Sequence, residues 1–172
     1  MSKKQPNKPA APATAWFPPV GKLWPGQGIY AGIMRGEKGL PDYHLFISGD
    51  PATAHAGIAW GASGQHEAGA CSAFDGHANT AALVASKHDH PAAQWAAGLH
   101  ADGHADWYLP SRRELRLLWV NVPELMAEGW HWSSTQYGAR SAWGQDFAGG
   151  YQFYYGKAHE GRARAVRRFL IT

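Results

Sequence analysis

Residues 111–155 read SRRELRLLWVNVPELMAEGWHWSSTQYGARSAWGQDFAGGYQFYY, and their hydrophobic spacing changes from helical to strand-like. The first ten residues predict a helix, because Ser111 and Glu114 match a capping box and apolar residues then recur at helical spacing. Pro123 ends this pattern. From Trp130 onward apolar and polar residues alternate, which is typical of strands. The stretch therefore predicts a domain that contains both helices and strands.

Two of the later strands form a predicted hairpin. Residues 141–147 and 151–155 flank the glycine pair 149–150, which is a two-residue turn signal. Counting outward from this turn places Asp146 opposite Phe153. Because side chains alternate along a strand, this pairing also predicts which residues share a face.

The two faces of the hairpin differ in bulk. Trp143 and Phe147 give one face large side chains at both ends of a strand, so we expect that face to lie on the core. The other face then forms an exposed aromatic shelf beside small residues and Asp146. We define the aromatic shelf as Tyr151, Phe153 and Tyr155. The alternative buries the shelf, and a one-residue error in register would produce it.

Working outward, the remaining segments predict strands first, helices in the middle and strands last. The expected elements are strands at 29–31 and 43–47, helices at 80–86 and 91–98, and a terminal strand at 163–171. Asn79 is the expected cap of the helix at 80–86. This order predicts an α+β domain.

Length and composition indicate one domain preceded by an arm. The chain has 172 residues, of which 45% are hydrophobic and 17% charged, enough to bury a core. Residues 1–19 are rich in Pro, Ala and Lys and predict an extended arm, which leaves residues 20–172 as the domain. Trp16 and Phe17 are the expected anchors of this arm on a neighbouring subunit, and the alternative is a solvated tail.

Charge and apolar patterning argue against several classes of protein. The net charge of +3 permits an anionic partner, but no stripe of Lys and Arg is visible, so we expect no nucleic-acid partner. Part of the charge comes from arginines near the end of the chain, namely Arg162, Arg164, Arg167 and Arg168. No apolar run reaches the ~18 residues of a membrane span. The Pro-rich start does not match a secretory signal.

Candidate metal and catalytic residues are few. His100 and His104 are four residues apart, but neighbouring glycines predict a loop there, so we assign no metal ligands. A structural calcium ion held by Asp side chains and loop carbonyls stays open, and no other cofactor is expected. The single Cys71 excludes an internal disulfide. Neither Cys71 nor Ser133 has the sequence context of a nucleophile, so no catalytic residue is assigned.

Three blocks in a fixed order resemble the Lcl C-terminal domain family. They are DWYLPSRREL at 106–115, WHWSSTQY at 130–137 and GRARAVRRF at 161–169. The likeness extends over about residues 26–169. The resemblance implies a C-type lectin-like fold that serves binding and not catalysis, in a family found in bacterial surface proteins, prophages and phages.

Some members of this family resemble the variable proteins of diversity-generating retroelements. On that pattern, the ligand-contacting positions lie between the WSST block and the terminal VR. In this chain they would be Arg140, Ser141, Gly144, Asp146, Tyr151, Phe153, Tyr155 and His159. These positions agree with the face that alternation alone assigned to the aromatic shelf.

The combined expectation is a non-enzymatic protein of a virion surface, either a receptor-binding tip or a capsid decoration. It would be made in the host cytoplasm without a signal peptide and would form a homo-oligomer. The arm would bind other virion proteins, and the aromatic shelf would bind a glycan or protein of the host surface. One alternative is a structural particle component with its aromatic residues at subunit interfaces. The other is an enzyme of the formylglycine-generating type, whose chemistry relies on a cysteine pair that this chain lacks.

Overall fold

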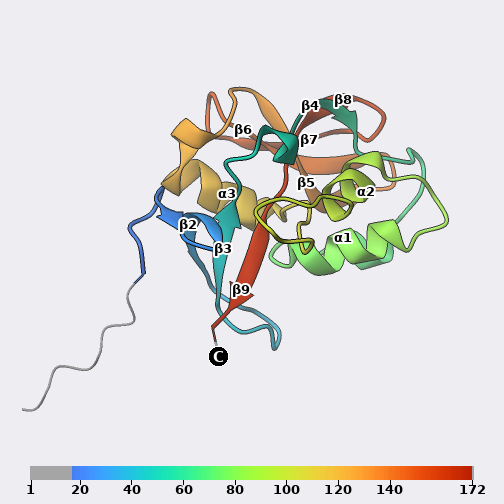
Figure 1. Cartoon of the computed structure of the whole chain (residues 1–172). Helices are drawn as coiled ribbons and strands as arrows, with labels where there is room; N and C mark the ends of the chain where they lie inside the picture. Colours follow the sequence, from blue (N-terminus) through green and yellow to red (C-terminus); the bar gives the residue numbers. More distant parts are fainter. Residues whose placement is uncertain (1–16, 172) are drawn as a thin grey trace, which may run out of the picture.

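Two β-sheets and three α-helices make up residues 17–171, the part of the chain that the computed structural model describes (Figure 1). The first sheet has the order β1 (Leu23–Trp24), β2 (Gly28–Met34), β3 (Tyr43–Ile47) and β9 (Arg167–Leu170). The second has the order β4 (Ala54–Ala59), β8 (Glu160–Arg164), β5 (Trp130–Gly138), β6 (Ser141–Asp146) and β7 (Gln152–Gly156). The helices are α1 (Gly76–Val84), α2 (Pro91–Ala97) and α3 (Arg112–Asn121). The predicted α+β class is confirmed.

Helix α3 packs against strands of both sheets, as Figure 1 shows. Its capping box is present: the Ser111 hydroxyl accepts from the Glu114 amide, and the Ser111 amide donates to the Glu114 carboxylate at 2.7 Å. Leu115 and Leu118 are fully buried in the core beneath the first sheet. The helix ends ahead of Pro123, as the sequence predicts.

The cap predicted for the helix at 80–86 is wrong. Helix α1 begins at Gly76, and the Asp75 side chain caps it by accepting from the Ala78 amide at 3.0 Å. Asn79 lies inside the helix and is buried, with its side chain bonded to both backbone groups of Ser72. Both Asp and Asn are good caps, so sequence alone did not separate the two positions.

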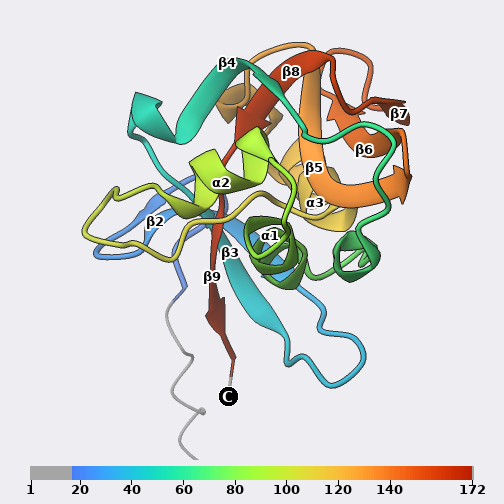
Figure 2. The same ribbon diagram turned by 90° about the vertical axis from the view of Figure 1, so that its right-hand side faces the viewer.

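The single strand predicted at 163–171 is also wrong, because the chain there contributes two strands to two sheets. Strand β8 belongs to the second sheet and β9 to the first. Between them, the amides of Ala165 and Val166 donate to the carbonyls of Thr53 and Tyr108. Ala165 and Val166 thus connect the second sheet to the first, and β9 pairs with β3 (Figure 2).

The first residue that the structure describes, Phe17, packs on the outer face of the first sheet. Its ring centroid lies 4.7 Å from that of His44 and 5.7 Å from that of Trp24. The Phe17 side chain remains 43% exposed. This expected anchor therefore makes part of its contacts within its own domain. The second expected anchor, Trp16, lies outside the described residues. Within residues 17–171, no helix is long and apolar enough to cross a membrane.

Candidate functional site

The β6–β7 hairpin has a longer connection than the sequence predicts. Gly144 pairs with Phe153, which differs by two residues from the predicted register. The Asp146 amide donates to the Tyr151 carbonyl and the Gly150 amide donates to the Asp146 carbonyl, which closes a loop over 147–151. Because a shift of two residues keeps side chains on the same face, the predicted division into faces is retained.

Helix α3 holds this hairpin in place. The Arg116 guanidinium donates to the Gly150 carbonyl. Arg112 and Gln152 form two hydrogen bonds: the Arg112 Nε donates to the Gln152 Oε1, and the Gln152 side-chain Nε2 donates to the Arg112 carbonyl. Gly150 has a φ of +76° and lies against the Trp119 ring, so a side chain at this position would collide with the helix. The loop that begins the aromatic shelf is therefore positioned by the core.

The aromatic shelf is exposed, as expected. Tyr151 is 60% exposed, and Phe153 and Tyr155 are each 47% exposed. Phe147, on the other face, is buried. Trp143, which was expected in the core with Phe147, is only half-buried.

The residues around Trp143 explain why it is only half-buried. The Arg112 guanidinium lies 3.8 Å from its ring centroid, and the rings of Tyr137 and Tyr154 meet it edge-on. A charged group and two tyrosines therefore cover Trp143 in place of apolar core. This face of the hairpin forms a second, partly exposed aromatic group, with Tyr137 stacked on Tyr154 at 3.8 Å.

A cavity of about 310 Å³ opens beside the aromatic shelf, and we call it the Trp130 cavity. It is lined by Trp130, Trp132, Asp146, Tyr151, Tyr155, His159 and Glu160. The Tyr155 ring stands edge-on to the Trp130 ring, with centroids 4.9 Å apart. The structure thus brings together four of the predicted site residues, Asp146, Tyr151, Tyr155 and His159.

The other predicted site positions differ in how exposed they are, and none of them lines the Trp130 cavity. Phe153 is exposed on the same face but does not line the cavity. Ser141 is half-buried, and Arg140 is exposed in the turn before β6, where its carbonyl accepts from the Lys157 amide. Gly144 was expected at the surface and is instead buried, because the Trp130 ring covers it. The expectation of an exposed Gly144 is wrong, because a side chain of the neighbouring strand β5 covers it.

Three lining residues were missed by reasoning from the sequence: Trp130, Trp132 and Glu160. The signal for the first two was available in the alternation of WHW, which places both indoles on one face of β5. Trp130 pairs with Asp146 across the β5–β6 ladder, which puts an indole beside a predicted site carboxylate. No sequence signal pointed to Glu160, which reaches the cavity from β8.

The Trp130 cavity combines aromatic rings with two carboxylates. Aromatic faces offer apolar stacking surface, and the carboxylates of Asp146 and Glu160 accept hydrogen bonds from hydroxyl or amide groups. The volume lies at the lower end of the roughly 300–1,000 Å³ typical of small-molecule sites. This combination suits a polar ligand that also has apolar faces.

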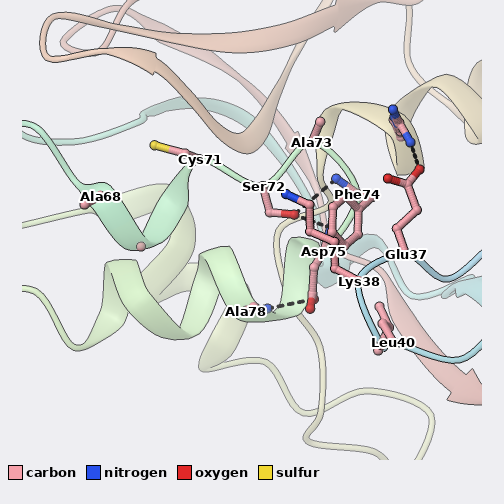
Figure 3. A pocket seen from close by; sticks show the side chains of 13 residues that line it. Glu37, Lys38, Leu40, Ala68, Cys71, Ser72, Ala73, Phe74, Asp75 and Ala78 are labelled. Carbon is pink, nitrogen blue, oxygen red and sulfur yellow. Dashed lines mark hydrogen bonds and ion pairs between the residues drawn. The ribbon is translucent and has the colours of Figure 1, made fainter.

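A larger hollow lies elsewhere, between the loop at 36–40 and the segment at 68–78 (Figure 3). It has a volume of about 830 Å³. Three of its four charged lining residues form ion pairs within the chain, because Arg113 pairs with Glu37 and Asp75 pairs with Arg168. The fourth, Lys38, lies over the Phe74 ring, with 5.7 Å between its ammonium nitrogen and the ring centroid. Cys71 is exposed at one end, with its sulfur turned away from Asp75. We therefore favour the Trp130 cavity as the functional site.

Histidines and carboxylates do not gather into a metal site in the described part of the chain. Across residues 17–171, no group of three or more His, Cys, Asp or Glu side chains could hold a metal ion. His100 and His104 bond to different backbone carbonyls, those of Gly98 and Gly26.

The fold is an α+β domain that presents exposed aromatic side chains beside the Trp130 cavity. This chain belongs to the Lcl C-terminal domain family, whose model matches residues 52–167. The matched range contains the aromatic shelf and every residue that lines the Trp130 cavity. A comparison with curated proteins found no match.

Proposed function

We propose that this protein is a non-enzymatic binding protein of a virion surface, with a C-type lectin-like fold and the Trp130 cavity as its ligand site. The observation that carries the proposal is the aromatic shelf, three large rings about half exposed to solvent on a hairpin that hydrogen bonds from helix α3 hold in place. Rigid exposed aromatic residues provide contact area at a low cost in conformational entropy, which suits recognition.

Membership of the Lcl C-terminal domain family supports the remaining parts of this proposal. The family resemblance implies a role in phages or on bacterial surfaces and a C-type lectin-like fold. The two-sheet α+β architecture, in which β9 returns to pair with the early strand β3, is compatible with that fold. The single cysteine favours binding over formylglycine-type oxidation, which relies on a cysteine pair.

We propose a host-surface glycan as the preferred ligand. A sugar ring has an apolar face that stacks on aromatic side chains and hydroxyl groups that donate to carboxylates. The Trp130 cavity offers both through Tyr151, Tyr155 and Asp146. A protein ligand would use the same surface through its own aromatic and polar groups.

Partners within the particle would contact the opposite end of the domain. Apolar side chains that are more than a third exposed gather along the first sheet and at the end of the arm: Phe17, Val20, Leu23, Ile33, Phe169, Leu170 and Ile171. Such exposed apolar groups mark protein contacts. We propose that the arm and this sheet contact other virion proteins or a second copy of the chain.

The decisive experiment compares attachment with stability in four variants. Tyr151→Ala and Tyr155→Ala should retain a near-native unfolding midpoint and weaken attachment to host cells by about 2 kcal/mol or more, because exposed aromatic residues can dominate recognition. Phe147→Ala should lower the free energy of unfolding by ~3–5 kcal/mol, because the ring is buried. Tyr137→Ala is the control, since Tyr137 of β5 is 52% exposed but packs against Trp143 on the other face of the hairpin.

A different pattern would contradict this function. If attachment falls only in proportion to stability across the four variants, the aromatic shelf is structural and the particle-component alternative is favoured. If Tyr137→Ala weakens attachment as much as Tyr155→Ala while both stay folded, the ligand site lies on the opposite face of the hairpin.

A further inference from the structure

The four arginines near the end of the chain have unequal partners. Arg167 pairs with Asp106, with 2.9 Å between Nε and Oδ1, and Arg168 pairs with Asp75 at 2.8 Å. Arg162 and Arg164 make no ion pair with any carboxylate among residues 17–171. Two cations of this segment therefore lack a counter-ion in the described part of the chain.

These two arginines lie side by side on one face of a central strand. Strand β8 runs between β4 and β5 (Figure 2), and residues two apart on a strand share a face. His131 of β5 pairs directly with Arg162, so its side chain lies on that face as well. Together the three side chains line a cavity of about 150 Å³.

The remaining walls of this cavity carry no negative charge. They consist of Ala54, His55, Ala56, Leu125, Ala127 and Ala163. The His55 ring stands edge-on to Trp95, with centroids 5.6 Å apart, so it packs there and not on the arginines. The lining therefore combines two guanidinium groups and two imidazole rings with apolar side chains.

Arg164 in particular is poorly compensated. Its Nη2 donates to the Ser48 carbonyl, but its Nε is buried and has no hydrogen-bond partner among the described residues. Burial lowers the pKa of Arg164, and burial together with the charges of Arg162 and Arg164 lowers the pKa of His131 to about 4. A desolvated guanidinium with an unused donor costs free energy unless a ligand supplies the acceptor.

We propose that this cavity binds a small oxyanion group, a phosphate, sulfate or carboxylate, held by Arg162 and Arg164. A guanidinium presents two parallel N–H donors that match two oxygens of such a group. The cavity equals about five times the ~30 Å³ that one water occupies in the liquid, which is room for one such group. The group could be a free inorganic anion or the charged end of a larger molecule, since the chemistry of the contact is the same.

This site is distinct from the proposed ligand site. The two cavities share no lining residue. Trp130 and His131 are neighbours on β5, and neighbours on a strand point to opposite faces. Anion binding and attachment to host cells can therefore fail separately.

The test follows the Arg164 Nε–H signal of the full chain by NMR during titration with sodium phosphate, sodium sulfate or sodium acetate. Sodium chloride at equal ionic strength is the reference. We expect at least one of the three oxyanions to shift this signal saturably and to raise the unfolding midpoint above the chloride value. Arg162→Gln and Arg164→Gln should each weaken binding roughly tenfold, as expected when a charge-assisted contact is lost.

Arg35→Gln is the matched control, because Arg35 is an exposed arginine outside this cavity, and it should bind as the native chain does. A phosphorylated hexose that binds more tightly than inorganic phosphate identifies the end group of a larger molecule as the ligand. Weaker binding of the hexose identifies a free anion. The proposal is overturned if no oxyanion moves the Arg164 signal of the native chain, a result that does not depend on any variant folding. An equal loss of affinity in Arg35→Gln and Arg162→Gln also overturns it.

Discussion

Lys157 shows how one residue can carry a charge into the interior. Its side chain is fully buried, and its ammonium group donates to the Gln65 carbonyl at 2.7 Å and to the Gln136 side-chain oxygen at 2.6 Å. The same group lies 4.6 Å from the centroid of the Trp60 ring. These contacts offset part of the cost of removing the ammonium from water.

Burial lowers the pKa of Lys157 from 10.5 to about 8, which makes stability depend on pH. Between these two values the unfolded chain binds more protons at this site than the folded chain does, so the free energy of unfolding contributed by Lys157 rises with pH. We therefore expect the native chain to gain stability relative to Lys157→Met as the pH rises from 8 toward 10.5. Urea unfolding across this range measures the difference.

The control for this prediction is Lys87→Met, which removes an exposed lysine. Its stability should follow that of the native chain at every pH. Parallel pH profiles for the native chain and Lys157→Met would show that Lys157 keeps its ordinary pKa on folding.

At the scale of the elements, the buried carboxylate of Glu114 has two roles, one in the capping box of α3 and one in contacts with other segments. Glu114 completes the cap of α3 and also accepts from the hydroxyl groups of Tyr43 at 2.8 Å and Tyr108 at 2.6 Å. Burial raises the pKa of Glu114. A local helix signal thus also anchors α3 to β3 of the first sheet.

Ser111→Ala removes the half of the capping box that serves only the helix. We expect the free energy of unfolding to fall by about 1 kcal/mol, because one amide at the start of α3 loses its acceptor. Thermal or urea unfolding measures this change, and attachment to host cells should stay native, since Ser111 does not line the Trp130 cavity. An unchanged stability would show that the cap contributes nothing. Lost attachment with intact stability would place the LPSRREL segment in the ligand site.

For the whole molecule, the arm and the domain meet at Phe17. Two truncations separate their roles: removal of residues 1–16 and removal of residues 1–19. The second also removes the Phe17 ring from His44 and Trp24, so its unfolding midpoint should lie below that of the first. Both should remain folded and fail to enter the proposed particle, because Trp16 is absent from each.

Incorporation into the particle is measured by sedimentation of the truncated protein with its assembly. Normal incorporation of both truncated proteins would show that the arm is not the anchor. The first sheet would then be the expected contact with other particle proteins. If the protein that lacks residues 1–16 unfolds, part of the arm belongs to the core.

The sequence alone determined those features that depend on neighbours along the chain. Helix α3 and its capping box follow from residues within one turn of helix, and the shared face of the aromatic shelf follows from alternation within one strand. The α+β class and the Lcl C-terminal domain family were also evident from the order of these local patterns. The predicted faces of the hairpin survived a register error because the error was an even number of residues.

Only the tertiary structure decided which distant segments meet. The division of 163–171 into β8 and β9 depends on backbone groups of Thr53 and Tyr108, which no local pattern connects to Ala165 and Val166. Trp143 is half-buried because Arg112 covers it, and Gly144 is buried because Trp130 does. The partners of the terminal arginines were likewise set by folding: two received carboxylates from distant segments, and Arg162 and Arg164 received none from the described residues. Burial and pairing are properties of contacts between segments, so the spacing of residues along one segment does not determine them.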